Sequence, residues 1–307
     1  MKRRDVLKTI GMAGALAGLK LPLSASAASG KGKRSLRVIQ ITDIHLQPEQ
    51  DAPEGLRKTF THINKNYPDA DFIINTGDVI MDALEENRKR VRQQWDLWHK
   101  ISGEENKLPI ENCIGNHDIW GFGPLADPKY GKAWAVDALE LPGRFRSFDR
   151  GNWHFIVLDS TQIDNSGNWY TAYLDQQQFD WLVDDLEKTP ADKPVFIMSH
   201  IPIISSSVFF TGESDTEKPG YWHFPQSWMH GDARRISKLF EKYQNIKVAV
   251  SGHMHMVDRV DFKNVTYLCN GAVSGNWWNG ALYGFHPGYA VIDLFDDGTF
   301  ENSYVAY

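Results

Sequence analysis

Cysteine is scarce in this sequence. Only two of its 307 residues are cysteines, Cys113 and Cys269, and both are flanked by apolar residues of expected strands. A chain of this size buries enough surface to fold without a disulfide, so we expect two buried free thiols. An exported location would still permit a disulfide between them.

Long apolar runs are also lacking. The N-terminal apolar stretch, residues 9–23, contains Lys20 and is rich in glycine and alanine. It falls short of the roughly 20 consecutive apolar residues that a membrane-spanning helix needs. No cysteine near residue 27 offers a site for a lipid. We therefore expect no stable membrane anchor.

The first 27 residues are instead typical of a secretion signal. Arg3 and Arg4 form a twin-arginine start, and Ala25-Ser26-Ala27 is a small-residue cleavage site. We expect a twin-arginine signal peptide over residues 1–27, recognised by the twin-arginine export machinery. The mature chain is then expected to work in the periplasm or outside the cell.

The mature chain has no excess of basic residues. Without residues 1–27 it has 28 basic and 38 acidic residues, a formal net charge of −10. Nucleic-acid binding needs a cationic face for the phosphate backbone, so no nucleic-acid partner is expected. Residues 28–35 are expected to be a flexible leader, and residues 36–307 fit a single domain.

Short apolar runs and helical patterns alternate along this domain. Strands buried on both faces are expected at residues 38–41, 72–74, 195–198 and 248–250. Helices are expected at residues 54–67, 84–101, 175–188 and 232–243, the last two with an aspartate as N-cap. Hairpins are expected at residues 144–159 and 289–307. The pattern predicts an α/β fold.

Oxygen and imidazole side chains follow the expected strands directly. The motifs are Asp43-Ile44-His45, Gly77-Asp78, Gly115-Asn116-His117-Asp118, His200 and Gly252-His253-Met254-His255. Sites in α/β proteins form beyond the carboxyl ends of strands, so these side chains are expected to converge. Mixed carboxylate and imidazole ligands suit Mn, Fe or Zn better than Ca or Mg.

The order of these motifs resembles the calcineurin-like metallophosphoesterase superfamily over residues 36–255. The resemblance implies two mixed β-sheets sandwiched and flanked by helices, and hydrolysis of a small phosphoester at a binuclear metal centre. It also implies that a metal-bridging hydroxide attacks phosphorus. It assigns one metal to Asp43, His45 and His255, the other to Asn116, His200 and His253, and the bridge to Asp78.

The resemblance gives His117 a catalytic role. It implies that His117 donates a proton to the leaving oxygen or stabilises charge on the phosphoryl group. An imidazole suits this because its pKa lies near working pH. Asp118 is expected to orient His117.

Two departures narrow the resemblance. Purple acid phosphatases have a tyrosine where this chain has Met81, and Ser/Thr protein phosphatases have an arginine where it has Ile114. The remaining pattern resembles a small bacterial phosphodiesterase group that includes cyclic-nucleotide phosphodiesterases. We therefore expect a phosphodiesterase acting on a nucleotide-like or aryl ester. A phosphomonoesterase and a non-catalytic metal-binding scaffold of the same fold remain alternatives.

Aromatic residues gather in loops that follow the ligand-bearing segments. Those expected to line the substrate cleft are Trp120, Trp222, His223, Trp277 and Trp278. Stacking on such rings supplies roughly 1–3 kcal/mol per base, which favours a flat substrate group. The alternative is that these rings pack beneath the loops.

Overall fold

The computed structural model describes residues 32–307, except residues 165, 166, 168, 212, 215–219 and 221. The expected signal peptide and residues 28–31 of the expected leader lie outside the described residues. The last leader residues, Arg34 and Ser35, instead begin the first strand, β1 (Arg34–Ile41). Residues Gly32–Tyr307 form one compact unit.

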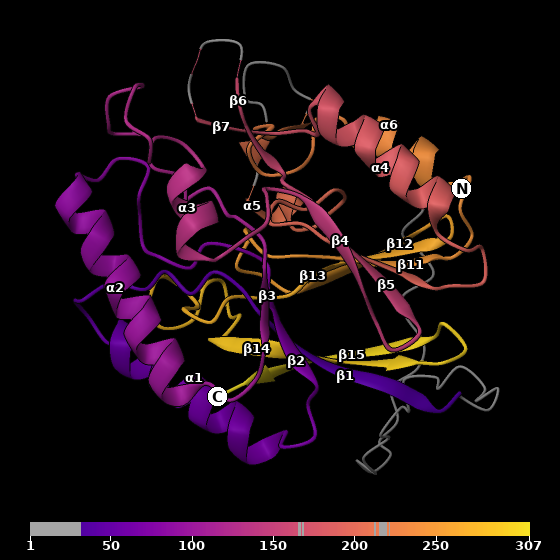
Figure 1. Cartoon of the computed structure of the whole chain (residues 1–307), viewed down its shortest axis with the longest axis horizontal. Helices are drawn as coiled ribbons and strands as arrows, with labels where there is room; N and C mark the ends of the chain where they lie inside the picture. Colours follow the sequence, from indigo (N-terminus) through magenta and orange to yellow (C-terminus); the bar gives the residue numbers. More distant parts are fainter. Residues whose placement is uncertain (1–31, 165–166, 168, 212, 215–219, 221) are drawn as a thin grey trace, which may run out of the picture. The chain divides into compact units, whose positions relative to one another are not determined.

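One large sheet is formed around β1. Its other strands are β2 (Phe72–Asn75), β3 (Ile110–Asn112), β14 (Gly288–Phe295) and β15 (Phe300–Ala306). The order is β15-β14-β1-β2-β3 (Figure 1). Strands β1, β2 and β3 run parallel, whereas β14 is antiparallel to both β1 and β15. The sheet is therefore mixed.

The second large sheet is also mixed. It consists of β4 (Arg146–Arg150), β5 (Trp153–Val157), β8 (Val195–Met198), β11 (Ile246–Ser251), β12 (Asp258–Phe262) and β13 (Val265–Cys269). The order is β12-β13-β11-β8-β5-β4. Its four inner strands are parallel, and the edge strands β4 and β12 are antiparallel to their neighbours.

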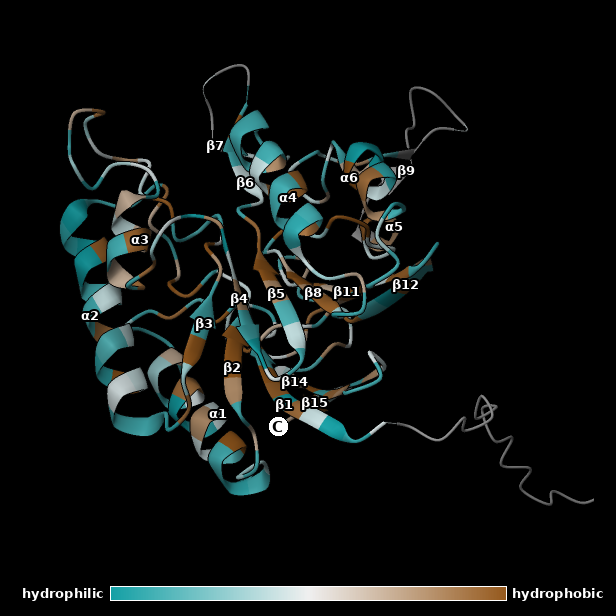
Figure 2. Cartoon of the chain, turned by 45° about the vertical axis from the view of Figure 1, so that its right-hand side comes forward, coloured by the Kyte–Doolittle hydropathy of each residue, from teal (hydrophilic) through white to brown (hydrophobic). Residues whose placement is uncertain are grey.

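Helices flank both sheets (Figure 2). Those packed on the first sheet are α1 (Ala52–Asn66), α2 (Arg88–Glu105) and α3 (Ala133–Ala138). Those packed on the second are α4 (Gln176–Lys188) and α6 (Ala233–Phe240). None of the described helices has the length and apolar character needed to cross a membrane.

The core lies in three layers because strand side chains alternate between the two faces of each sheet. In β1, Ile39 and Ile41 pack with residues of α1 and α2, whereas Val38 packs with residues of the second sheet such as Phe155. The indole Nε1 of Trp153 donates to the Phe295 carbonyl at 3.0 Å and links the two sheets. The expected fold of two mixed sheets with flanking helices is confirmed.

Four minor strands complete the described part of the chain. Strands β6 (Thr161–Ile163) and β7 (Trp169–Ala172) form one hairpin, and β9 (Glu213–Ser214) pairs with β10 (Trp222–His223). The short helix α5 (Val208–Thr211) precedes β9. The β6–β7 hairpin matters for function because it carries a residue of the site.

Helix ends differ in part from the expectation. Asp175 caps α4 by accepting from Gln178 N at 2.9 Å, as predicted. Helix α2 begins at Arg88 rather than Leu84, because the Asn87 side chain accepts from the first free N–H groups. Asp232 makes no cap bond for α6, since its carboxylate accepts from Leu174 N at 3.0 Å and contacts His230.

Candidate active site

The first group of candidate ligands lies where β1 ends and in the loop after β11. Asp43, His45 and His255 bring their ligand atoms within 4.8 Å of one another, and all three are buried. The Nε2 atoms of His45 and His255 are 3.0 Å apart. The Oδ1 atom of Asp43 lies 3.4 Å from His255 Nε2.

A second group follows β2, β3, β8 and β11. His200 Nε2 lies 2.9 Å from Asn116 Oδ1 and 3.3 Å from His253 Nδ1. Asp78 connects the two groups, because its Oδ2 atom is 3.2 Å from His200 Nε2 and 3.8 Å from His45 Nε2. The seven side chains selected from the sequence therefore converge, with Asp78 between the two groups.

The lone pairs of these ligands point at one another. His200 and His255 each present Nδ1 to a backbone carbonyl, of Thr76 at 2.8 Å and Gly275 at 2.6 Å. Each Nδ1 therefore carries a proton, and Nε2 is the ring nitrogen that faces the site and that a metal would bind. The buried Asp43 Oδ1 has no hydrogen-bond donor among the described residues. Several acceptor atoms therefore face one another without a donor between them. Bound cations fit such a site, because they supply the missing positive charge.

The pKa values reflect this concentration of acceptors. Burial would lower the pKa of His200, but the Asp78 carboxylate raises it to about 9. Burial and, after it, the neighbouring His200 together lower the pKa of His253 to about 3. Two imidazoles of one group thus prefer opposite charge states, because the carboxylates attract a positive charge that only one ring can hold.

Five of the candidate ligands have a backbone conformation that residues other than glycine rarely adopt. Positive φ angles are found at Asp43 (50°), His45 (47°), Asp78 (54°), His253 (69°) and His255 (55°). Each such residue costs on the order of 1–3 kcal/mol, and such outliers gather at functional sites. The chain turns sharply after each strand and thereby directs these side chains into one site.

Two glycines allow the ligand loops to approach closely. A Cβ atom on Gly252 would overlap Thr42 and the Asp43 carboxylate, and one on Gly115 would overlap Asp78. Glycine is therefore required at both positions by close contact rather than by a special φ angle, since neither has a positive one.

His117 lies beside the ligands. Its ring packs edge-on against His45 at 4.8 Å between centroids, and its backbone N–H donates to Asp78 Oδ1 at 2.8 Å. The nearest carboxylate to its ring is Asp82, with 3.5 Å between Nδ1 and Oδ1. Asp82 was not predicted from the sequence, because no motif connects it with His117.

The expectation that Asp118 orients His117 is wrong. The Asp118 carboxylate instead accepts four backbone N–H groups, from Gly115 (2.9 Å), Asp78 (3.0 Å), Val79 (2.9 Å) and Ile80 (3.3 Å). Burial and the nearby Asp78 charge raise its pKa to about 7. Asp118 holds two ligand loops together, and its oxygens are turned toward the backbone.

A pocket of about 470 Å³ opens onto the candidate ligands. Its lining includes five polar residues of the site, His45, Asp78, His117, His253 and His255. The rest of its lining is aromatic and apolar and consists of Tyr170, Trp228, Met254, Trp277, Leu282 and Tyr283. The ring of Tyr170, from β7, packs edge-on against His253 at 5.8 Å, and burial raises its pKa to about 12. Its hydroxyl is therefore neutral.

Of the residues expected to line the cleft, Trp277 lies in the pocket, and Trp120 and Trp278 do not. The Trp277 ring packs on His255 at 4.4 Å between centroids and lines the pocket. Trp120 is 3% exposed and packs against Trp134 in the core beneath the loop. Trp278 donates from Nε1 to the carbonyls of Ile44 and His45 and supports the ligand loop from behind.

The remaining two expected lining residues, Trp222 and His223, form β10. His223 is exposed and does not line the pocket, whereas the Trp222 side chain lies outside the described part of the chain. Tyr170 and Tyr283, which also line the pocket, were not predicted from the sequence, because no motif marks them. Cys113 and Cys269 are both buried free thiols.

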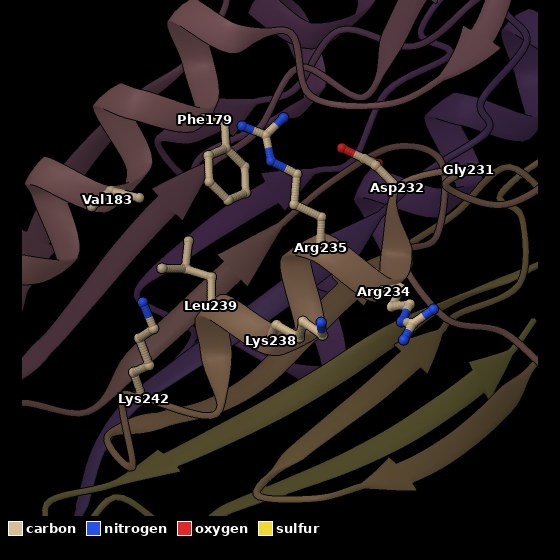
Figure 3. Close-up of a pocket in the computed structure, with 9 residues that line it drawn as sticks. All are labelled: Phe179, Val183, Gly231, Asp232, Arg234, Arg235, Lys238, Leu239 and Lys242. Carbon is tan, nitrogen blue, oxygen red and sulfur yellow. The ribbon is translucent and has the colours of Figure 1, made fainter.

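A second hollow, of about 610 Å³, lies between α4 and α6 (Figure 3). Phe179 and Leu239 contribute apolar surface, and Arg234, Arg235 and Lys238 contribute charge. It contains none of the candidate ligands, so the smaller pocket is the one in which metal chemistry can occur.

Comparison with known proteins agrees with this site. Residues 36–257 match the sequence model of the family described as calcineurin-like phosphoesterase. The chain belongs to the calcineurin-like phosphoesterase family. It is accordingly a metal-dependent phosphoester hydrolase of the dimetal type, with His and Asp groups placed to bind the metals.

Three members illustrate its place among the calcineurin-like phosphoesterases. A 3′,5′-cyclic-nucleotide phosphodiesterase of Nostoc sp. is 26% identical over 87% of this chain and 91% of its own length. A probable glycerophosphodiester phosphodiesterase of Arcobacter nitrofigilis is 22% identical over 75% of this chain and 76% of its own. A dimetal phosphatase from Danio rerio shares the fold, with a TM-score of 0.64 and 13% identity over 89% of this chain and 99% of its own.

The role of Asp118 can be tested by Asp118→Asn. Either orientation of the amide places its NH₂ group against two backbone donors, so the free energy of unfolding should fall by about 2–3 kcal/mol. Urea unfolding of the metal-free protein measures this. The matched control His117→Gln should change it by less than about 0.5 kcal/mol. An Asp118→Asn variant as stable as the wild type would contradict the role of Asp118 in holding the two loops together.

Proposed function

We propose that this protein is a phosphodiesterase that hydrolyses esters with an aromatic or apolar group. The observation that carries the proposal is the lining of the pocket. Among the described residues it contains no arginine or lysine, and apart from the candidate ligands and His117 it is aromatic and apolar. Such a surface suits a substrate of low charge with a flat group.

Charge favours a diester over a monoester. A phosphodiester carries one negative charge at neutral pH, whereas a monoester carries close to two because its second pKa is near 6. Transfer of the extra charge into an apolar pocket is costly unless a cation pairs with it. Beyond the bound metals, the described lining offers no permanent cation for a monoester. A phosphomonoesterase is therefore the less favoured alternative.

The residues of this chain have distinct roles in the proposed reaction. Asp43, His45 and His255 would hold one metal and Asn116, His200 and His253 the other, with Asp78 shared. Two bound divalent ions, which we propose are Mn, Fe or Zn, supply Lewis acidity and a nucleophile at neutral pH.

His117 is the proposed general acid. Its side chain lines the pocket beside the ligands, from where it can donate a proton to the departing ester oxygen. Asp82 is a positioning residue, because its carboxylate is the nearest one to His117 Nδ1. Its main chain is fixed in turn, since Asp82 N donates to Gln94 Oε1 and the Asp82 carbonyl accepts from Gln94 Nε2.

The names of the two relatives support a diester substrate. One is described as acting on 3′,5′-cyclic nucleotides and the other as a probable glycerophosphodiester phosphodiesterase. An aromatic wall favours a nucleobase or aryl group over glycerol, because a flat group stacks on the Trp277 ring.

We further propose that the protein is exported. The paired Arg3 and Arg4, the weakly apolar residues 9–23 and Ala25-Ser26-Ala27 support a twin-arginine signal. The twin-arginine machinery is then a transient partner, and the mature enzyme works beyond the cytoplasmic membrane.

Substrate preference tests the proposed function. The metal-reconstituted enzyme should hydrolyse bis(p-nitrophenyl) phosphate with a kcat/KM at least about tenfold higher than p-nitrophenyl phosphate, because only the monoester brings an unpaired second charge. Leu282→Lys should lower the ratio of the diester kcat/KM to the monoester kcat/KM, because its cation can pair with the second charge. The uncharged control Leu282→Gln should leave this ratio unchanged. A monoester preference in the wild type would refute the proposal.

The proposed roles of His117 as general acid and Asp82 as positioning residue lead to a second prediction. His117→Ala should lower kcat by roughly 10²–10⁴ and leave the metal content unchanged, because it removes a general acid and no ligand. Asp82→Asn should lower kcat by about tenfold in the wild type and not at all in His117→Ala, since it acts through that ring. Loss of a metal equivalent in His117→Ala would make His117 a ligand.

Export can be tested by changing Arg3 and Arg4 together to Lys. This variant should accumulate as precursor in the cytoplasm, because the export machinery reads the paired arginines. N-terminal sequencing of the exported wild type should find a start at or near Ala28. Exported protein that retains Met1 would indicate an anchor instead.

A further inference from the structure

The apolar wall of the pocket continues outward onto the surface. Tyr283 lines the pocket and is 61% exposed. Its ring packs edge-on against Phe210 of α5 at 5.4 Å between centroids, and Phe210 is 65% exposed. Two large rings from segments distant in sequence thus meet at the edge of the pocket, and most of their apolar surface remains in water.

The backbone at Tyr283 is unfavourable for this residue. Leu282 and Phe285 exchange both backbone hydrogen bonds, at 3.0 and 2.8 Å, around the two-residue turn Tyr283-Gly284. Both turn residues have positive φ angles, 49° and 89°. Asparagine, aspartate and glycine are preferred at such positions, and a tyrosine is strained there. Folding alone gives no reason for a tyrosine at this turn.

A second aromatic residue of the pocket also has an unfavourable backbone conformation. Trp277, which packs on His255, also has a positive φ, of 47°. The loop between β13 and β14 thus has positive φ angles at Trp277 and Tyr283, which line the pocket, and at Trp278, which supports the ligand loop. Backbone strain of this kind gathers at functional sites, and the rings of Trp277 and Tyr283 line the pocket that contains the candidate ligands.

We infer that Tyr283 and Phe210 form an outer subsite for an extended apolar or aromatic group on one arm of the substrate. This inference rests on the proposed phosphodiesterase function. The inner ring, Trp277, contacts the part of the arm next to phosphorus, and the outer pair contacts its far end. The substrate class is then an acyclic diester with a long apolar arm, rather than one with a small polar alcohol.

Two diesters with the same leaving group test the subsite. Both are p-nitrophenyl phosphodiesters, and the second arm is methyl in one and 4-phenylbutyl in the other. The wild type should have a KM about five- to thirtyfold lower for the phenylbutyl diester, as expected from burial of one more ring. The kcat values should be similar, because the leaving group is the same.

The variants Tyr283→Asn and Phe210→Ser should each raise KM for the phenylbutyl diester, so that the advantage in KM of the phenylbutyl over the methyl diester falls about three- to tenfold. Tyr283→Asn should also melt no lower than the wild type, since asparagine tolerates the turn. The matched control Leu125→Ser removes an apolar side chain that is 82% exposed and does not line the pocket, so it should change neither KM.

The outcomes separate this inference from the proposed function. If neither diester is hydrolysed in preference to p-nitrophenyl phosphate, the phosphodiesterase function fails. If both diesters are hydrolysed but their KM values are equal, the subsite is refuted while the phosphodiesterase function stands. Equal KM changes for both diesters in Tyr283→Asn and Phe210→Ser would also refute it, because they would report a general disturbance of the pocket.

Discussion

The buried carboxylate of Asp118 is the contact on which the geometry of the site depends most. It accepts N–H groups from the loop after β2, at residues 78–80, and from the loop after β3, at Gly115. The two loops are thereby fixed to each other. Asp78, in the first loop, also accepts the backbone N–H of His117, in the second. One side chain thus fixes the position of the shared ligand and of the proposed acid together.

The fold of two packed sheets positions the remaining candidate ligands. Parallel strands of both sheets end at the site, so the ligands of β1 and β2 meet those that follow β8 and β11. The strained residues Asp43, His45, His253 and His255 require a rigid frame, which the buried strands supply. Backbone strain at the ligands is offset by apolar burial in layers that have no part in the chemistry.

The ligands could be predicted from the sequence because their motifs follow apolar strands directly and in a fixed order. The sheet arrangement followed from the same resemblance. The partner of His117 could not be predicted, since Asp118 and Asp82 are both near it in space and only the direction of each carboxylate distinguishes them.

The aromatic wall was predictable only in outline. Trp120 and Trp277 each follow a ligand-bearing segment, yet the first turns into the core and the second lines the pocket. Loop conformation decides this, and the positive φ of Trp277 is not visible in the residue type. Tyr283 was missed for the same reason, because a tyrosine is an unexpected residue in a tight turn.

Anomalous X-ray diffraction from crystals of the manganese- or zinc-loaded protein tests the central claim most directly. Two peaks should appear, one among Asp43, His45 and His255 and the other among Asn116, His200 and His253, with the Asp78 carboxylate between them. A single peak, or metal bound away from these side chains, would contradict the two-metal site.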